Sequence, residues 1–152
     1  SARHLMEAAT LMCPHRAGAH HAGYTDWELG WSFAHREQDG CCMVAAARVE
    51  LTVTRTVPRW RPPHAADREL VSSWAELVAA ITKHEQGHVD IAVSGAHSLH
   101  DALRAIAPST SLEQLEVRVA AVAESSLGAI RATDLAYDQA TQHGARQGVR
   151  LP

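Results

Sequence analysis

Apolar and polar residues alternate over two stretches in the first third of the chain, which predicts two strands. The apolar positions of the first stretch are Trp27, Leu29, Trp31 and Phe33. Those of the second, longer stretch are Met43, Ala45, Ala47, Val49, Leu51 and Val53. The residues Gln38-Asp39-Gly40 between them are typical of a turn. The two strands are therefore predicted to pair as an antiparallel hairpin.

Apolar residues recur at steps of three and four from about residue 65 to residue 106, which predicts one long helix. We expect a kink or break near Ser94-Gly95, because glycine lowers helix stability. The preceding segment, residues 58–63, is rich in proline and is predicted to be an extended linker. A short helix is also expected near residues 2–12, followed by a loop over residues 14–23.

A second long helix is predicted to open at the capping box Ser111-Leu112-Glu113-Gln114 and to stop at Gly144. The expected fold class is therefore α+β, with a small antiparallel N-terminal sheet packed on two long C-terminal helices. The length suits a single domain over residues 1–152.

Composition and charge argue against two classes of protein, those that bind nucleic acid and those that span a membrane. The net charge is −3 and no basic block is present, which argues against a nucleic-acid partner. No apolar run approaches the ~20 residues of a membrane-spanning helix. No signal peptide is visible. The cysteines are Cys13, Cys41 and Cys42, so one disulfide from Cys13 to either of the others and three reduced thiols are both open.

The pentapeptide His84-Glu85-Gln86-Gly87-His88 carries the chemistry. Two histidines four residues apart share one face of a helix, so both imidazoles can bind one Zn²⁺. Glu85 is offset from that pair around the helix, where it can act as the general base on a metal-activated water. Both histidines continue the buried stripe of the long helix, and buried imidazoles need partners.

A catalytic zinc site usually needs a third protein ligand. The preferred candidate is His143, just past the face formed by Tyr137, Asp138 and Thr141. Asp138 is the next candidate, either as a direct ligand or as a carboxylate that orients a zinc-bound histidine. Glu113 and Glu116 are weaker candidates, because glutamate is common at a helix start for other reasons. Tyr137 is a candidate catalytic residue whose hydroxyl could donate to an oxyanion.

The chain resembles a bacterial domain-of-unknown-function family described as secreted zinc-dependent proteases. The resemblance covers most of the chain and rests on these blocks: Tyr24-Thr25-Asp26-Trp27, Leu51-Thr52-Val53, Pro58-Arg59-Trp60, Trp74, the pentapeptide, residues 137–144 and Gln147-Gly148. It implies a zincin-like metallopeptidase with a secreted or periplasmic location. It also implies a cysteine near residues 105–112 as a partner for Cys41 or Cys42, and this chain has none there.

The expected function is hydrolysis of peptide or protein substrates by a zinc metallopeptidase, with His84, His88 and His143 as ligands and Glu85 as base. An extended substrate could add to an edge of the sheet. One alternative is a non-catalytic metal-binding or scaffold protein that keeps a peptidase-like site. Another is an interaction module whose histidine pair belongs to the core. Hydrolysis of a small-molecule amide is also open, and imidazole sites also accept Fe, Co, Ni or Cu.

Overall fold

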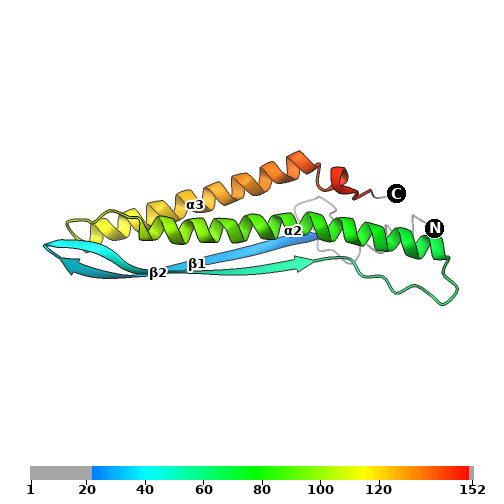
Figure 1. The fold of residues 1–152 in the computed structure, drawn as a ribbon, viewed down its shortest axis with the longest axis horizontal. Coiled ribbons are helices and arrows are strands. Elements are labelled where there is room, and N and C mark those ends of the chain that lie inside the picture. The colour runs from blue at the N-terminus through cyan, green and yellow to red at the C-terminus, as the bar shows by residue number, and fades with distance from the viewer. Residues whose placement is uncertain (1–21, 151–152) are drawn as a thin grey trace. The chain divides into compact units, whose positions relative to one another are not determined.

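Two strands and two long helices make up most of the protein, in the order β1, β2, α2 and α3 (Figure 1). The structure is a computed structural model that describes residues 22–150. β1 (Tyr24–Gln38) and β2 (Cys41–Thr56) form a two-stranded antiparallel sheet. The α+β class predicted from the sequence is therefore confirmed.

The hairpin turn is the one that the sequence predicts. Asp39 and Gly40 have φ angles of 54° and 75°, and both central residues of a type I′ turn need positive φ. After the turn, the residues of β2 that face the apolar cluster do not keep the single alternating phase that the sequence pattern predicted. In β2 the inward residues include Cys42 and Val44, whereas further along they include Ala47 and Val49.

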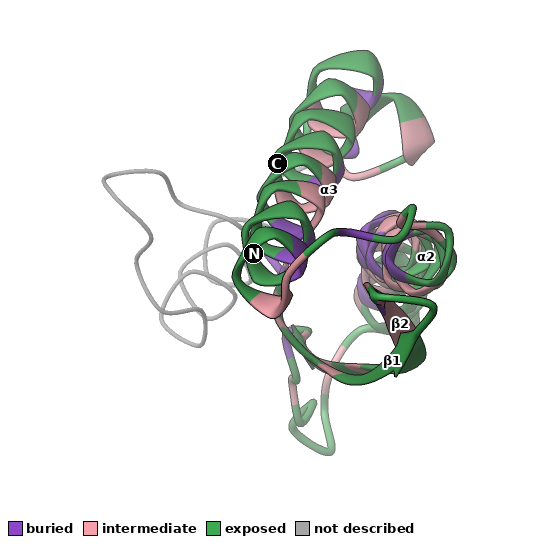
Figure 2. Cartoon of the chain, turned by 90° about the vertical axis from the view of Figure 1, so that its left-hand side faces the viewer, coloured by how far each residue is buried: buried purple, intermediate pink, exposed green. Residues whose placement is uncertain are grey.

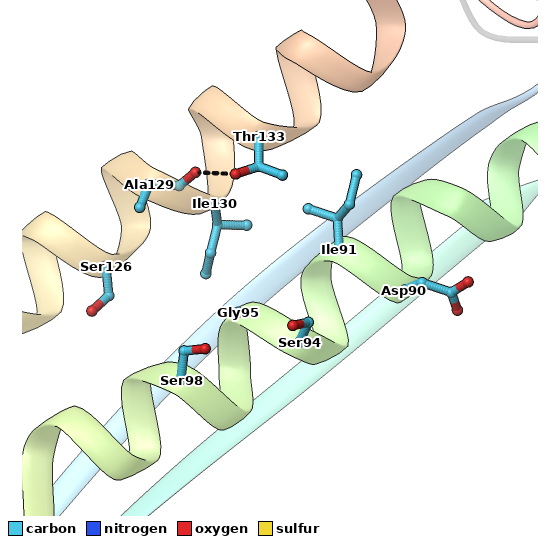
Figure 3. Close-up of a pocket in the computed structure, with 9 residues that line it drawn as sticks. All are labelled: Asp90, Ile91, Ser94, Gly95, Ser98, Ser126, Ala129, Ile130 and Thr133. Atoms are coloured by element: carbon cyan, nitrogen blue, oxygen red, sulfur yellow. Dashed lines mark hydrogen bonds between the residues drawn. The ribbon is translucent and has the colours of Figure 1, made fainter. Parts of the chain in front are cut away.

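Helix α2 (Arg68–Arg104) begins after Asp67, whose Oδ1 accepts a hydrogen bond from the Glu69 N–H at 3.0 Å. The helix runs unbroken through Ser94-Gly95, so the expectation of a break there was wrong, and that of a kink stays a prediction. Packing against α3 explains why a glycine stands at position 95. A Cβ on residue 95 would lie 2.3 Å from Cγ1 of Ile130, and Figure 3 shows Ile130 pointing toward Gly95. Glycine is therefore needed here because α3 approaches α2 closely.

Helix α3 (Leu112–Thr141) begins at the predicted cap, because the Ser111 Oγ accepts a hydrogen bond from the Gln114 N–H at 3.3 Å. It ends at Thr141, three residues before Gly144, the predicted stop. The N–H of His143 donates to Asp138 O at 2.9 Å and that of Gln142 donates to Gln139 O at 3.3 Å. This pair of bonds is a Schellman motif, with Gln142 in the left-handed conformation that Gly144 was expected to supply.

Contacts divide the described part of the chain into two compact units. Unit 1 comprises residues 22–26, 54–89 and 136–150, and unit 2 comprises residues 27–53 and 90–135. Each strand and each long helix contributes residues to both units, and the single-domain expectation stays a prediction. Figure 2 shows that buried positions are few and occur mainly on α2 and α3.

Each unit has its own apolar cluster. In unit 2 the buried side chains come from both helices, and partly buried strand residues such as Leu29, Phe33 and Val49 pack against them. The buried members are Leu99, Leu103, Val119 and Ala123. In unit 1 Trp74 packs edge-to-face on Trp60, a residue of the extended linker, with ring centroids 5.8 Å apart. Residues 57–63 are neither helix nor strand, as predicted.

Cys41 and Cys42 are free thiols in the part of the chain that the structure describes. The backbone of Cys42 pairs with that of Ser109, with N–H···O distances of 2.7 and 2.8 Å. Ser109 thus lies within residues 105–112, where the family resemblance implied a cysteine as a partner for Cys41 or Cys42. Its hydroxyl is buried and has no hydrogen-bond partner within residues 22–150. The expected helix near residues 2–12, the loop up to residue 21 and Cys13 lie outside the described residues.

No helix within residues 22–150 combines the length and the apolar character that crossing a bilayer requires.

Candidate functional site

His84 and His88 lie on one buried face of α2, in unit 1. Their side chains belong to residues that are 6 % and 8 % exposed. The two Nε2 atoms are 3.3 Å apart, and the rings meet edge-to-face with centroids 4.9 Å apart. The spacing that the sequence predicted is therefore realised in the fold, with both nitrogens directed to one point.

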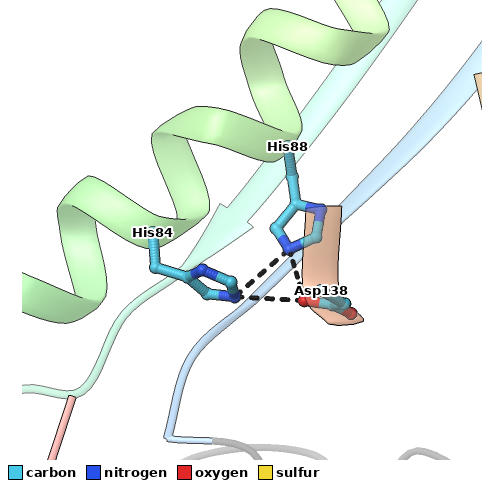
Figure 4. Close-up of side chains that lie close together, drawn as sticks. All are labelled: His84, His88 and Asp138. Atoms are coloured by element: carbon cyan, nitrogen blue, oxygen red, sulfur yellow. Dashed lines mark hydrogen bonds and ion pairs between the residues drawn. The ribbon is translucent and has the colours of Figure 1, made fainter. Parts of the chain in front are cut away.

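Asp138, on α3, is brought to that same point. Its Oδ1 lies 3.2 Å from the Nε2 of His84 and 3.1 Å from the Nε2 of His88 (Figure 4). The three donor atoms form a nearly equilateral triangle, and these residues are the group within residues 22–150 whose ligand atoms all converge. Asp138 was the second choice from the sequence for this position.

These three side chains fit a divalent metal ion. Four ligands arranged tetrahedrally at 2.0–2.1 Å from a zinc ion lie about 3.3–3.4 Å from one another. The observed edges of 3.1–3.3 Å are close to that value. A neutral imidazole with its proton on Nδ1 offers a lone pair at Nε2, and a carboxylate offers only lone pairs. Three such groups repel one another unless a cation or a shared proton lies between them.

Gln147 and Tyr137 fix the ring of His84. The Gln147 Nε2 donates to the Tyr137 hydroxyl at 2.9 Å, so its Oε1 is the atom that faces the Nδ1 of His84 at 2.9 Å. That oxygen places the His84 proton on Nδ1 and leaves Nε2 as the free ligand atom. The Tyr137 hydroxyl in turn donates to the backbone oxygen of His84 at 3.1 Å, and its ring stacks on the imidazole at 5.2 Å.

Tyr137 was also predicted to donate to an oxyanion. The structure places its hydroxyl between the His84 carbonyl and the Gln147 side chain. A tyrosine hydroxyl has one hydrogen to donate, and its two acceptors here are the His84 carbonyl oxygen at 3.1 Å and the Gln147 Oε1 at 3.3 Å. The contacts of Tyr137 therefore support a role in positioning His84, and the oxyanion role stays a prediction.

Glu85 is the most buried acidic residue near the cluster, at 4 % exposed. Its Oε2 accepts a hydrogen bond of 2.8 Å from the hydroxyl of Thr25, at the start of β1. Burial raises the pKa of the Glu85 carboxyl above its ordinary value, and the Thr25 hydrogen bond and the nearby histidines partly offset that rise. A carboxyl group with a raised pKa is better matched to accepting and returning a proton near neutral pH.

His143, the preferred third ligand from the sequence, lies beside the cluster but outside the triangle. Its Nδ1 is 3.5 Å from the Oδ2 of Asp138, and its side chain is 62 % exposed. Its φ of 52° belongs to the turn that ends α3. The geometry thus favours Asp138 as the third ligand and puts His143 against the opposite carboxylate oxygen. Glu113 and Glu116 are exposed residues in the first turns of α3, in unit 2.

A cleft of about 450 Å³ lies between α2 and α3 in unit 2 (Figure 3). Its lining consists of Asp90, Ile91, Ser94, Gly95, Ser98, Ser126, Ala129, Ile130 and Thr133. These side chains include neither an imidazole nor a thiol. The described residues that the sequence predicted as metal ligands therefore do not line this cleft, and His84, His88 and Asp138 come together elsewhere.

The glycine within the pentapeptide is required by Tyr137. A Cβ on residue 87 would lie 2.2 Å from both Cζ and the hydroxyl oxygen of Tyr137. The tyrosine cannot move aside without losing its stacking on His84 and its hydrogen bonds. No feature of the sequence alone pointed to this contact.

Gly87→Ala is therefore expected to lower the free energy of unfolding by about 1–3 kcal/mol, the usual cost of overpacking. Thermal unfolding followed by circular dichroism measures the change. Gly128→Ala is the matched control, because a Cβ on that helical residue meets nothing within 4 Å and should raise the stability by up to ~1 kcal/mol. Equal changes in the free energy of unfolding of the two variants would contradict the contact with Tyr137.

Sequence reasoning missed the roles of two residues. Thr25 and Gln147 stood in blocks of the family resemblance, but no spacing rule connects them to the pentapeptide, 60 residues or more away. Both contacts arise only when the start of β1 and the segment after α3 reach α2. The one available signal for Thr25 and Gln147 was their place in the sequence blocks on which the family resemblance rests.

Comparisons with known proteins give one result. A search of curated proteins and a search of solved structures found no match. A family model described as a bacterial protein of unknown function (DUF922) matches residues 1–144, which is nearly the whole chain. The chain therefore belongs to this bacterial family of unknown function.

Proposed function

We propose that the protein is a zinc-dependent metallopeptidase in which His84, His88 and Asp138 hold the metal and Glu85 is the general base. The observation that carries this proposal is the convergence of two imidazole nitrogens and one carboxylate oxygen, with every separation between 3.1 and 3.3 Å. Two histidines and one carboxylate, with a fourth position left for water, are a common ligand set of catalytic zinc.

Bound zinc would supply a water of lowered pKa and a Lewis acid for the scissile carbonyl. The other roles belong to the chain itself. Glu85 accepts a proton from the attacking water and donates it to the nitrogen of the leaving amine. Gln147 and Tyr137 hold the His84 ring and its tautomer through the hydrogen bonds described above. A metal held only for structure would have no use for a buried carboxyl group next to its ligands.

The non-catalytic alternative has one observation in its favour. His143 lies 3.5 Å from the second oxygen of Asp138, so a small movement could bring it to the metal as a fourth protein ligand. A site closed by four protein ligands would be structural and would leave no position for water. Spectra of the cobalt-substituted protein before and after addition of a hydroxamate separate the two cases. An unchanged spectrum would favour the closed site.

Metal removal tests the proposal directly. The protein purified without chelator is expected to contain one zinc per chain by elemental mass spectrometry. Treatment with a chelator should abolish cleavage of a mixed peptide library, and added zinc should restore it. Iron found in place of zinc would contradict the assignment, since two histidines and one carboxylate also suit Fe(II). A zinc-loaded protein that cleaves no peptide would contradict the peptidase proposal and support the scaffold alternative.

A further inference from the structure

The block Tyr24-Thr25-Asp26-Trp27 has no role in holding the metal, yet the fold brings its threonine to the proposed base. Thr25 is 9 % exposed and lies at the start of β1. Its hydroxyl donates to the Oε2 of Glu85 at 2.8 Å and lies 3.2 Å from the Glu85 backbone oxygen. The single hydroxyl hydrogen favours the shorter, charge-assisted contact with the carboxylate.

The other carboxylate oxygen faces a different environment. An ideal Cβ on Gly23 would lie 3.3 Å from the Oε1 of Glu85 and 2.6 Å from Cγ2 of Ile81. The backbone just before β1 therefore passes close to this oxygen, and the glycine leaves the space open. A cavity of about 30 Å³ lies there, lined by Gly23, His84, Glu85 and His143 among others. This volume suits one water molecule.

We infer that Thr25 is a positioning residue for Glu85: it holds Oε2 so that Oε1 faces the water-sized cavity beside His84. This inference rests on the proposed function, because it assigns a purpose to the orientation of the base. A glutamate side chain has three rotatable bonds, and without the hydroxyl the carboxyl group can turn its oxygens away from the cavity. The Thr25 hydroxyl contacts Glu85, and Thr25 does not line the cavity, so its effect is transmitted through Glu85.

Thr25→Val tests the inference, because valine keeps the shape of threonine and removes the hydroxyl. With zinc-loaded protein and a cleaved peptide, we expect kcat to fall about 10- to 100-fold, with KM and zinc content unchanged. Thr25→Ser restores the hydroxyl and is expected to keep most of kcat. Thr54→Val, an exposed threonine on β2, is the matched control and should behave as the parent. A kcat for Thr25→Val equal to that of the parent would overturn the inference.

A second readout does not depend on catalysis. In the zinc-free protein the urea midpoints of Thr25→Val, Glu85→Ala and the double variant form a double-mutant cycle. We expect the double variant to unfold at a higher urea concentration than the sum of the two single shifts predicts, because the single shifts count the same contact twice. Additive shifts would show that the two side chains do not interact and would overturn the inference. If Thr25→Val does not fold, the pair Thr25→Ser and Thr25→Ala makes the same comparison.

The two proposals fail in different ways. If Glu85→Gln cleaves peptide as fast as the parent, the proposed function is wrong whatever Thr25 does. If Glu85 is essential but Thr25→Val retains full kcat, the metallopeptidase assignment stands and only the positioning role is lost.

Discussion

Replacing Glu85 with glutamine is expected to lower the rate of peptide cleavage by about 10²- to 10⁴-fold, the usual contribution of a general base. Glutamine has nearly the same shape and its Oε1 can still accept the hydrogen bond from Thr25. Its amide cannot accept a proton from water at neutral pH. The variant should therefore fold, bind one zinc per chain and fail in the chemical step.

The measurements are initial rates on a cleaved peptide, zinc content by elemental mass spectrometry, and the unfolding midpoint. Glu76→Gln is the matched control, because Glu76 is an exposed glutamate about two and a half turns earlier on α2. It should retain the parent rate. A Glu85→Gln variant that keeps the parent rate would remove Glu85 as the base. One that loses its zinc would mean that Glu85 contributes to holding the metal.

Asp138→Asn is expected to weaken zinc binding by more than about 100-fold, whereas His143→Ala should change it far less. Loss of an outer hydrogen-bond partner of a metal ligand typically costs 10- to 100-fold in affinity, and loss of the ligand's charge should exceed that. The reason for the difference is geometric. Asp138 Oδ1 lies 3.1–3.2 Å from both histidine nitrogens, while the His143 side chain is 62 % exposed and its Nδ1 lies 3.5 Å from the other carboxylate oxygen.

Competition with a zinc-binding dye gives the two dissociation constants under one set of conditions. His88→Ala is the positive control, since it removes a ligand predicted from both the sequence and the structure. Glu124→Gln, an exposed residue of α3, is the negative control. If His143→Ala loses zinc while Asp138→Asn keeps it, the third ligand is His143, as the sequence predicted, and the geometric preference for Asp138 is wrong.

The sequence determined the features that depend on neighbours along the chain. The hairpin follows from Asp39-Gly40, because aspartate and glycine accept the positive φ angles of a type I′ turn. The start of α3 follows from Ser111, whose hydroxyl caps the first turn. The pairing of His84 with His88 on one face of α2 follows from the helical repeat, since residues four apart are adjacent on a helix surface.

Only the tertiary structure decided the features that depend on how distant segments meet. Asp138 and His143 are five residues apart, and the left-handed turn at Gln142 and His143 ends the helical direction between them. That turn leaves Asp138 facing the two histidines and moves His143 to its outer side. The sequence predicted a kink or break at Gly95, whereas the structure shows that Ile130 of α3 packs against this glycine. Thr25 and Gln147 reach α2 from 60 and 63 residues away. Such contacts depend on helix packing and turn geometry, which no local pattern of residues encodes.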